Sequence, residues 1–203
     1  AYIQKKQKQI MVGEFSLSPA MLPSEILDLI TSGKTVLHPI TIPEGYRISE
    51  IAALFNSQGL VDRENFISET RDGNLIRSLG ISATNLEGYL FPETYHFSKY
   101  TPEKMIVQKM VATFKEQVFT PQVLKSAKES SLTWHEIITL ASLIEKETGL
   151  DSERKLISSV FHNRLRKNMR LQTDPTVIYA IENFDGNIRK RDLKIDSPYN
   201  TYR

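Results

Sequence analysis

The sequence predicts an α+β fold, and two observations carry this prediction. In the first half of the chain, short extended segments alternate with helical ones, whereas the second half shows only helical spacing of its apolar residues. With 203 residues, 40% of them hydrophobic, the chain is long enough for one large domain or for a domain with a smaller partner. We therefore expect a small α+β region over residues 1–97 and a mainly helical region over residues 98–203.

Three extended segments are predicted in the first half. Residues 13–19 alternate apolar and polar side chains, which is typical of a short strand. Residues 35–43 are rich in β-branched side chains, but their two prolines confine them to a sheet edge or to strand ends. Residues 86–97 form the third extended segment.

Three helices separate these segments. Pro23 near the start and Gly33 after the end bracket a helix over residues 23–32. Asp62 begins a short helix that runs to about residue 70. Between these two, helical spacing closed by Gly59 predicts a helix with four core residues: Ile48, Ile51, Ala52 and Phe55.

The second half is predicted to contain four helices. Pro102 begins the first, and Thr133 and Glu136 form a capping box for the second, which runs to Thr148. The third starts at residue 151 or 152, and the fourth starts at Asp174 as N-cap and ends near residue 183. The residues expected to be buried in the first and third helices are Ile106, Met110, Phe114, Ile157, Val160, Phe161 and Leu165.

Composition excludes several classes of function. The chain has 26 Lys and Arg against 24 Asp and Glu, and no recognised nucleic-acid-binding module accompanies them, so no nucleic acid is expected as a partner. The absence of cysteine excludes disulfides, zinc–thiolate sites and thiol catalysis. No segment approaches the roughly 20 apolar residues that a membrane-spanning helix needs.

Metal catalysis is not expected either. His135 and Glu136 match the start of a zinc-protease motif, but Thr139 stands where the second histidine would lie. Basic residues do gather near the C-terminus. They form either a solvated surface or a weak site for an anionic ligand, and the sequence allows both interpretations. These residues are Arg164, Arg166, Lys167, Arg170, Arg189, Lys190 and Arg191.

Two glutamates, Glu145 and Glu147, close the helix that the capping box begins. Its apolar stripe places them on opposite flanks, so periodicity predicts that both are half-buried and does not choose between them. Burial raises the pKa of a carboxyl group, as a general acid near neutral pH requires. The alternative is an ordinary helix end with solvated charges, and periodicity alone favours it.

Two further groups of side chains suit carbohydrate. Tyr89, Phe91 and Tyr95 would share one face of an extended strand, either as core residues or as a platform for sugar rings. Asp174 could serve as an N-cap alone. Uncharged or singly charged polar side chains that hydrogen-bond hydroxyls and amides occur near the C-terminus: Gln172, Thr173, Asp174, Tyr179, Tyr199, Asn200, Thr201 and Tyr202.

Six motifs in order resemble the YceG-like endolytic murein transglycosylases, the MltG family. They cover most of the chain from about residue 13 onward. The motifs are TIPEG (41–45), LEGYLFPETY (86–95), ASLIEKET (141–148), ER with VFHNRL (153–165), MRLQTDPTVIYA (169–180) and YNTY (199–202).

The resemblance implies a LysM-like α+β subdomain followed by a mainly helical, lysozyme-like catalytic domain, with residues 86–95 contributing to the cleft. It implies Glu147 as the catalytic general acid and base, with Glu145 in reserve, and no metal or cofactor. It also implies substrate-binding residues within the matched motifs: Glu87, Tyr89, Phe91, Tyr95, Asn163, Gln172, Thr173, Asp174, Tyr179, Tyr199, Asn200 and Tyr202.

The partners that the resemblance implies are peptidoglycan glycan strands and peptidoglycan synthases at the membrane. The resemblance also implies a single N-terminal membrane anchor, from which the family faces the cell wall, and a further segment beyond YNTY, and we expect both to lie outside this sequence. The expected location is therefore the extracytoplasmic side of the bacterial cytoplasmic membrane.

A single carboxyl group suffices for the reaction of this family. It protonates the glycosidic oxygen, and the 6-hydroxyl of N-acetylmuramic acid then attacks its own anomeric carbon and replaces water. Two alternatives stay open: a muramidase that hydrolyses the same bond, which would need a second carboxyl group, and a non-catalytic peptidoglycan-binding module.

Overall fold

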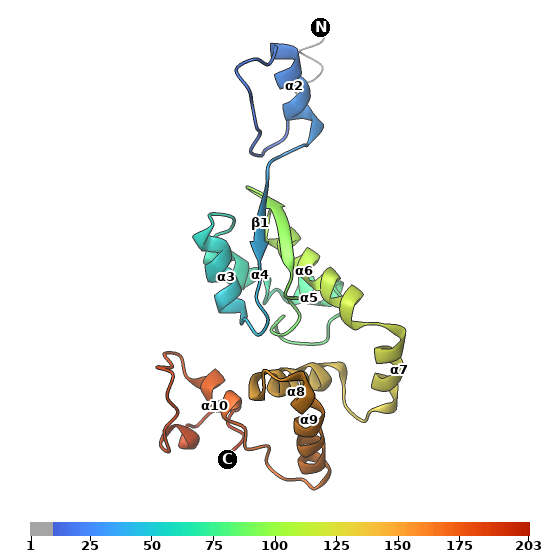
Figure 1. The fold of residues 1–203 in the computed structure, drawn as a ribbon, viewed down its shortest axis with the longest axis vertical. Helices are drawn as coiled ribbons and strands as arrows, with labels where there is room; N and C mark the ends of the chain where they lie inside the picture. The colour runs from blue at the N-terminus through green and yellow to red at the C-terminus, as the bar shows by residue number, and fades with distance from the viewer. Residues whose placement is uncertain (1–9) are drawn as a thin grey trace. The chain divides into compact units, whose positions relative to one another are not determined.

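The computed structural model describes residues 10–203, and it is α+β, as predicted: helices dominate, with one small sheet (Figure 1). The chain divides into two compact units, unit 1 up to Leu124 and unit 2 over Lys125–Arg203. This structural division lies about one helix after the predicted boundary near residue 97. The boundary near residue 97, between a LysM-like and a catalytic region, stays a prediction. No helix within residues 10–203 is long and apolar enough to cross a membrane.

Unit 1 contains the sheet and most of the buried apolar side chains. Its elements are α2 (Pro23–Ser32), β1 (Leu37–Thr41), α3 (Ile48–Ser57), α4 (Arg63–Glu69), α5 (Gly73–Ser78), β2 (Thr94–Ser98) and α6 (Glu103–Val118). α7 (Pro121–Glu129) crosses the boundary between the units.

The sheet consists of β1 and β2, paired antiparallel. Ile42 donates its amide to the Glu93 carbonyl at 3.0 Å, just beyond the pair of Thr41 with Thr94. Hydrogen-bonded pairs alternate along an antiparallel ladder, so the pair of Pro39 with His96 is a non-hydrogen-bonded one. The nitrogen of Pro39 therefore faces away from β2, where the missing N–H costs the sheet nothing.

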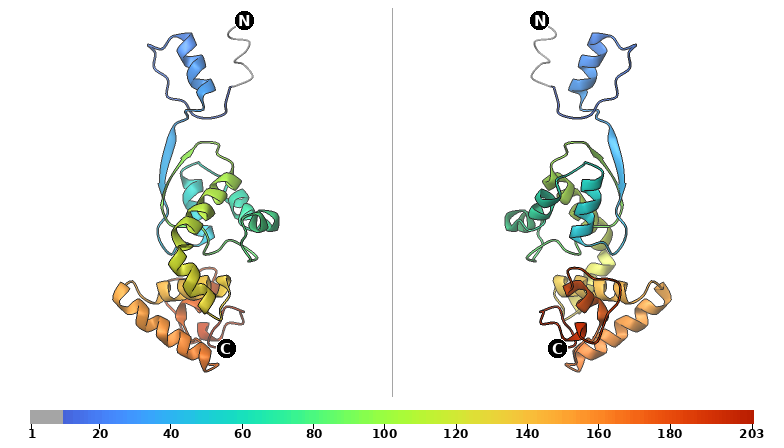
Figure 2. Two further views of the ribbon diagram at one scale, coloured as in Figure 1. Left: turned by 90° about the vertical axis from the view of Figure 1, so that its right-hand side faces the viewer. Right: turned by 90° about the vertical axis from the view of Figure 1, so that its left-hand side faces the viewer.

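The core of unit 1 forms where α3, α4 and α6 gather beside the two strands (Figure 1, Figure 2). Phe55 of α3 is fully buried, and its ring lies 5.4 Å from that of Phe66 and 5.8 Å from that of Phe97. The prediction of the core is confirmed here for α3 and α6, whose buried residues include Ile48, Ile51, Ala52, Phe55, Ile106, Met110 and Phe114.

Two predictions of extended structure in unit 1 are wrong. Residues 13–19 form no strand, although the Glu14 carbonyl accepts from the Val36 amide at 2.7 Å. Of residues 86–97, only those from Thr94 onward form a strand. Gly88 has a φ of 82°, which makes a turn and ends any regular alternation of side chains there.

Unit 2 is helical and has few buried apolar side chains. Its elements are α8 (Trp134–Glu147), α9 (Asp151–Arg166), α10 (Asp174–Ala180) and a 3-10 turn, η2 (Asp192–Lys194). α8 packs against both α9 and α10, and the buried apolar residues of the unit are Leu140, Phe161 and Val177. The predicted burial of Val160 and Leu165 is wrong, since they are 44% and 42% exposed.

Candidate active site

The site is built around Glu147, the last residue of α8. Thr148 ends the helix because its backbone is extended, with a φ of −146°. Its buried hydroxyl donates to Glu153 of α9 at 2.8 Å and accepts from the Leu150 amide at 3.0 Å. These bonds fix the turn between α8 and α9, and so fix where the end of α8 presents Glu147.

Glu147 points to the segment that begins α10. Its Oε1 accepts a hydrogen bond from the hydroxyl of Thr173, a residue that is only 1% exposed. Glu147 itself is exposed, so the prediction that it is half-buried is wrong. The end of the helix reaches past the small core of unit 2, which leaves this carboxyl accessible to a ligand.

Glu145 has a different set of partners. Its Oε2 lies 3.0 Å from Arg154 Nη2, and the same guanidinium lies 3.2 Å from Asp151 Oδ1. The Glu145 side chain is 36% exposed, so the predicted half-burial is correct for this residue. Glu145 therefore ties α8 to α9, while Glu147 meets the polar cluster formed by residues 170–176 and 199–202.

Three threonines form the centre of that cluster, and two of them, Thr173 and Thr176, are buried. The Thr173 amide donates to Thr201 Oγ1 at 3.1 Å, and its carbonyl accepts from Thr176 Oγ1 at 2.7 Å. The hydroxyls of Thr176 and Thr201 are 2.9 Å apart. The end of the chain is thereby joined to the start of α10 directly behind Glu147.

Asp174 and Tyr202 form a second polar pair in the cluster. The Tyr202 hydroxyl donates to Asp174 Oδ1 at 2.5 Å. This hydrogen bond, burial, and the negative charges of Asp174 and Glu147 raise the pKa of Tyr202 to about 12. The predicted N-cap role of Asp174 is wrong: Thr173 occupies the N-cap position and Asp174 is the first helical residue.

Arginines brace the loop before α10. Arg164 Nη1 donates to Gln172 Oε1 at 2.9 Å and to the Arg170 carbonyl at 2.8 Å, while Arg170 Nη1 donates to the Tyr202 carbonyl at 2.9 Å. Gln172 has a φ of 52°, rare for a residue with a side chain, and its amide donates to the Thr201 carbonyl at 3.1 Å. The strained backbone thus directs this loop along the last residues of the chain.

Asn200 and the pair of Tyr179 and Tyr199 complete the C-terminal part. Asn200 is buried, and its amide nitrogen donates to the carbonyls of Leu193 and Ile195 at 3.1 and 2.8 Å, which braces the YNTY segment. Tyr199 is 52% exposed and packs edge-on against Tyr179, with ring centroids 4.9 Å apart. On α9, the side-chain oxygen of Asn163 accepts from Arg166.

The remaining predicted residues lie in unit 1. Glu87 Oε1 accepts from the Ile48 amide at 3.2 Å at the start of α3. Tyr89 is 2% exposed and packs edge-on against Phe114 at 5.3 Å. Buried Tyr95 donates its hydroxyl to the Phe91 carbonyl at 2.7 Å. Tyr89 and Tyr95 are therefore core residues, and the expected shared strand face does not form because residues 86–93 are not a strand.

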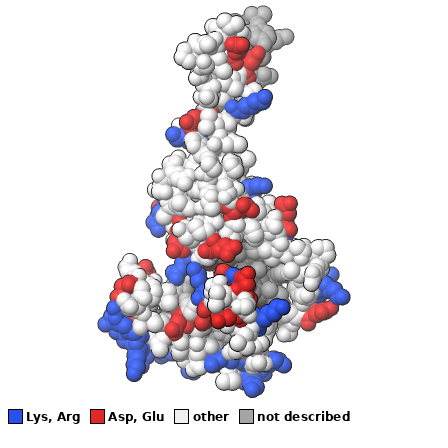
Figure 3. All heavy atoms as spheres, in the orientation of Figure 1, with Lys and Arg blue, Asp and Glu red and all other residues white. Residues whose placement is uncertain are grey.

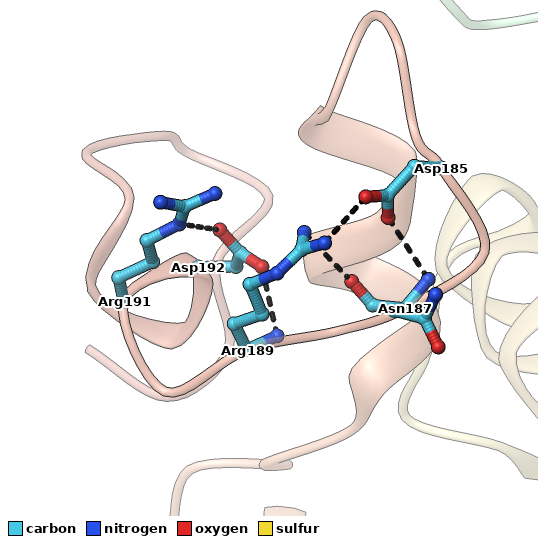
Figure 4. Close-up of polar contacts among 5 residues, drawn as sticks. All are labelled: Asp185, Asn187, Arg189, Arg191 and Asp192. Carbon is cyan, nitrogen blue, oxygen red and sulfur yellow. Dashed lines mark hydrogen bonds and ion pairs between the residues drawn. The ribbon is translucent and has the colours of Figure 1, made fainter.

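The arginines of unit 2 contact groups within the same unit. Figure 3 shows Lys and Arg side chains at separate places, with Asp and Glu between them. In the C-terminal loop, Arg189 Nη2 lies 2.5 Å from Asp185 Oδ2, which raises the pKa of Arg189 and lowers that of Asp185 (Figure 4). Arg191 lies 3.6 Å from Asp192 Oδ1. These contacts favour a structural role over an anion site.

Sequence reasoning missed the roles of Arg154, Arg164, Thr176 and Thr201. Thr176 lies three residues after Thr173, and this spacing on one helical turn is the signal that points to a shared contact. Arg154 lies three residues after Asp151, the same spacing, whereas for Arg164 the sequence carries no comparable signal because its partners lie in the loop after α9.

Comparison with known proteins agrees with this picture. The model of the YceG-like family matches residues 1–203. A Bacillus subtilis (strain 168) protein named endolytic murein transglycosylase is 36% identical over 207 residues, which cover 94% of this chain and 57% of that protein. One of the same name from Streptococcus pneumoniae serotype 2 (strain D39 / NCTC 7466) is 32% identical over 230 residues, which cover 98% of this chain and 41% of that protein.

A solved structure is similar as well. The 2.6 Å crystal structure of a YceG-like protein from Listeria monocytogenes superposes with a TM-score of 0.72 and 34% identity, covering 100% of this chain and 72% of that one. The chain spans about half the length of the curated relatives that it matches. The match of the family model over the whole chain, with relatives above 30% identity, shows that this protein belongs to the YceG-like family.

Proposed function

We propose that this chain has the activity of an endolytic murein transglycosylase, with Glu147 as its general acid and base. It would cleave the β-1,4 bond between N-acetylmuramic acid and N-acetylglucosamine inside nascent glycan strands, and so terminate their elongation. Two relatives at 36% and 32% identity carry the name of this activity. One observation supports Glu147 over Glu145: Glu147 faces the polar cluster, whereas both oxygens of Glu145 contact Arg154.

The proposed reaction needs one carboxyl group. Protonated Glu147 gives its proton to the glycosidic oxygen, the bond from that oxygen to the anomeric carbon breaks, and an oxocarbenium-like species develops. The carboxylate then removes the proton of the 6-hydroxyl as its oxygen bonds to the anomeric carbon. Glu147 ends protonated and no water is consumed. Tethering of the 6-hydroxyl is equivalent to an effective molarity on the order of 10⁵ M or more.

The side chains around Glu147 suit a sugar substrate. Exposed Tyr199, with Tyr179 behind it, offers an aromatic ring of the kind on which sugars pack. The Asp174–Tyr202 pair and exposed Gln172 present polar groups for hydroxyls and amides. We propose these five residues as the substrate contacts in unit 2. For unit 1 taken by itself, Glu87 and Phe91 stay predicted as substrate-binding residues.

The proposal also covers the subdomains, the substrate, the partners and the cellular location of the protein. We propose that the α+β region is LysM-like and the helical region lysozyme-like, that peptidoglycan glycan strands are the substrate, and that synthases at the membrane are the partners. The site of action would be the outer face of the bacterial cytoplasmic membrane, reached through a single N-terminal anchor. Fractionation of cells that express a tagged full-length protein tests this location.

The activity is tested with a pair of isosteric substitutions. We expect Glu147→Gln to lower the release of 1,6-anhydro products from purified glycan strands by at least about 10²-fold, because the amide cannot transfer a proton. The melting temperature should stay nearly unchanged, since Glu147 is exposed. Glu145→Gln is the matched control on the same helical turn, and it should retain activity.

Mass spectrometry of the products decides between the candidate functions. Products that end in a reducing sugar, heavier by one water, would identify a muramidase. Activity that survives Glu147→Gln but not Glu145→Gln would reverse the assignment. If the wild-type protein sediments with insoluble peptidoglycan yet releases no soluble product, the chain is a binding module and the proposed activity is wrong.

A further inference from the structure

We infer that Thr173 is a positioning residue that orients Glu147, and that Thr176 and Thr201 hold Thr173 in place through a directed chain of hydroxyl groups. This inference rests on the proposed function, because Glu147 is the group whose orientation matters. It assigns to Thr173 a role other than substrate contact.

Each threonine hydroxyl carries one hydrogen, so each can donate once. Thr173 gives its hydrogen to Glu147 Oε1, since a carboxylate oxygen only accepts. Thr176 gives its hydrogen to the Thr173 carbonyl, 2.7 Å away. In the 2.9 Å contact between Thr176 and Thr201, Thr201 is therefore the donor.

The hydrogen bonds thus all point in one direction. Thr201 donates to Thr176, Thr176 donates to the Thr173 carbonyl, and the Thr173 hydroxyl donates to Glu147. The Thr173 amide closes this chain of bonds by donating to Thr201 Oγ1 at 3.1 Å. Thr173 and Thr176 are 1% and 7% exposed, so water does not compete strongly for these bonds. Hydrogen bonds at its amide, its carbonyl and its hydroxyl therefore fix the position of Thr173.

This arrangement distinguishes the two oxygens of Glu147. Oε1 is occupied by the Thr173 hydroxyl, and within residues 10–203 no hydrogen bond is recorded to Oε2. In the acid form, the catalytic proton is then carried on Oε2, and the bond at Oε1 fixes the plane of the carboxyl group. Orientation of a reacting group is worth large factors in rate, since a displacement of about 1 Å can cost roughly 10²-fold.

The test uses steady-state release of anhydro products by the purified protein. Thr173→Val keeps the β-branched shape and removes the hydroxyl, and we expect kcat to fall by roughly 10²-fold with KM unchanged. Thr173→Ser restores the donor and should recover most of that loss. Thr139→Val is the matched control, because Thr139 lies on the same helix as Glu147 and its hydroxyl donates to the His135 carbonyl at 2.8 Å, away from the polar cluster.

Thr201→Val tests the remote end of the chain. We expect a smaller loss of kcat at unchanged KM, and we expect the Thr173→Val/Thr201→Val double variant to be no slower than Thr173→Val alone, because both act through one group. If Trp134 fluorescence shows that Thr173→Val does not fold, the inference is tested by comparing the kcat of Thr201→Val with that of the wild type. Wild-type kcat in Thr201→Val then overturns the inference.

The two proposals fail in different ways. If Glu147→Gln is inactive while Thr173→Val keeps wild-type kcat, the positioning role is wrong and the proposed function stands. If Thr173→Val loses activity through a raised KM alone, Thr173 contacts substrate and the inference is overturned. If Glu147→Gln keeps its activity, the proposed function itself is wrong.

Discussion

Two glutamates separated by a single residue have different surroundings because a helix turns by about 100° per residue. Glu145 and Glu147 are therefore about 200° apart around α8, one toward α9 and the other toward the start of α10. Periodicity predicted that they lie on opposite flanks. It did not predict which flank meets the polar motifs, because that depends on Thr173, 26 residues further along the chain.

Tyr202 provides a spectroscopic measure of the charge around Glu147. Its pKa is raised to about 12, first by the hydrogen bond to Asp174, then by burial and by the charges of Asp174 and Glu147. We expect Asp174→Asn to lower the pKa of Tyr202 clearly and Glu147→Gln to lower it slightly. Carbon-13 NMR of labelled tyrosine rings measures both changes.

The sign of the linked change in stability follows from the direction of this shift. A phenol whose pKa is higher in the folded state stabilises the fold fully below its unfolded value of 10, and that contribution is lost as pH rises from 10 to about 12. Tyr95 is the control: its pKa is also raised to about 12, but mainly by burial. Asp174→Asn should leave the Tyr95 signal unchanged, and equal movement of both signals would contradict the local origin proposed here.

At the scale of elements, helix ends with capping signals were predicted well. The capping box of α8 forms as expected: the Thr133 hydroxyl accepts from the Glu136 amide, and Glu136 Oε2 accepts from the Thr133 amide at 2.7 Å. The bounds of α2 match the residues between Pro23 and Gly33. Such signals are local, so a single sequence carries them in full.

The elements that were missed or wrong depend on contacts outside their own sequence. α5 is too short to show an apolar stripe. α7 has helical spacing of Val123, Leu124 and Ala127 but no buried residue, so its pattern is weak beside those of the core helices.

Residues 13–19 alternate as a strand does, but their backbone contact with this part of the chain is the bond from the Val36 amide to the Glu14 carbonyl, before β1 begins, and Pro39 leaves the outer edge of β1 without a donor at its centre. Burial on α9 was overestimated because unit 2 offers too little apolar surface to cover Val160 and Leu165.

The capping box leads to a prediction for α8. Bonds from the Thr133 amide and hydroxyl lower the pKa of Glu136, so this carboxylate stabilises the fold above the ordinary value of 4.5 and the contribution is lost as pH falls through the lowered value. We expect Thr133→Ala to reduce the free energy of unfolding by about 1 kcal/mol at neutral pH. Urea denaturation followed by Trp134 fluorescence measures this, with Thr139→Ala as the control on the same helix.

The dependence on pH separates the cap from a general packing effect. The penalty of Thr133→Ala should shrink at acid pH, as Glu136 becomes protonated below its lowered pKa and its half of the capping box weakens in the wild type as well. A penalty that is the same at neutral and at acid pH would contradict a role for the carboxylate.

At the scale of the whole molecule, the two units differ in what stabilises them. Among residues 10–203, all buried apolar side chains except Leu140, Phe161 and Val177 lie in unit 1. Unit 2 instead buries threonines and an asparagine that bond to one another or to the backbone. Burial of apolar surface is the main stabilising contribution in folding, whereas a hydrogen bond adds little net free energy.

We therefore expect unit 2 to open more readily than unit 1. Native-state hydrogen exchange followed by mass spectrometry should show slower exchange for amides of α3 and α6 than for those of α8 and α10, because local opening exposes less apolar surface in unit 2. Addition of a soluble glycan fragment should slow exchange in α8 and α10 selectively. Equal protection of all four helices would contradict the difference in stability.

The register of the small sheet bears on how the molecule behaves at high concentration. An exposed strand edge is a template on which a second chain can add a strand, and such growth needs a continuous row of amide donors. On the outer edge of β1 this row is broken at Pro39, the middle residue of the strand, which has no amide hydrogen to offer. Pro39, whose missing N–H costs the ladder with β2 nothing, thus protects the protein against edge-to-edge aggregation through β1.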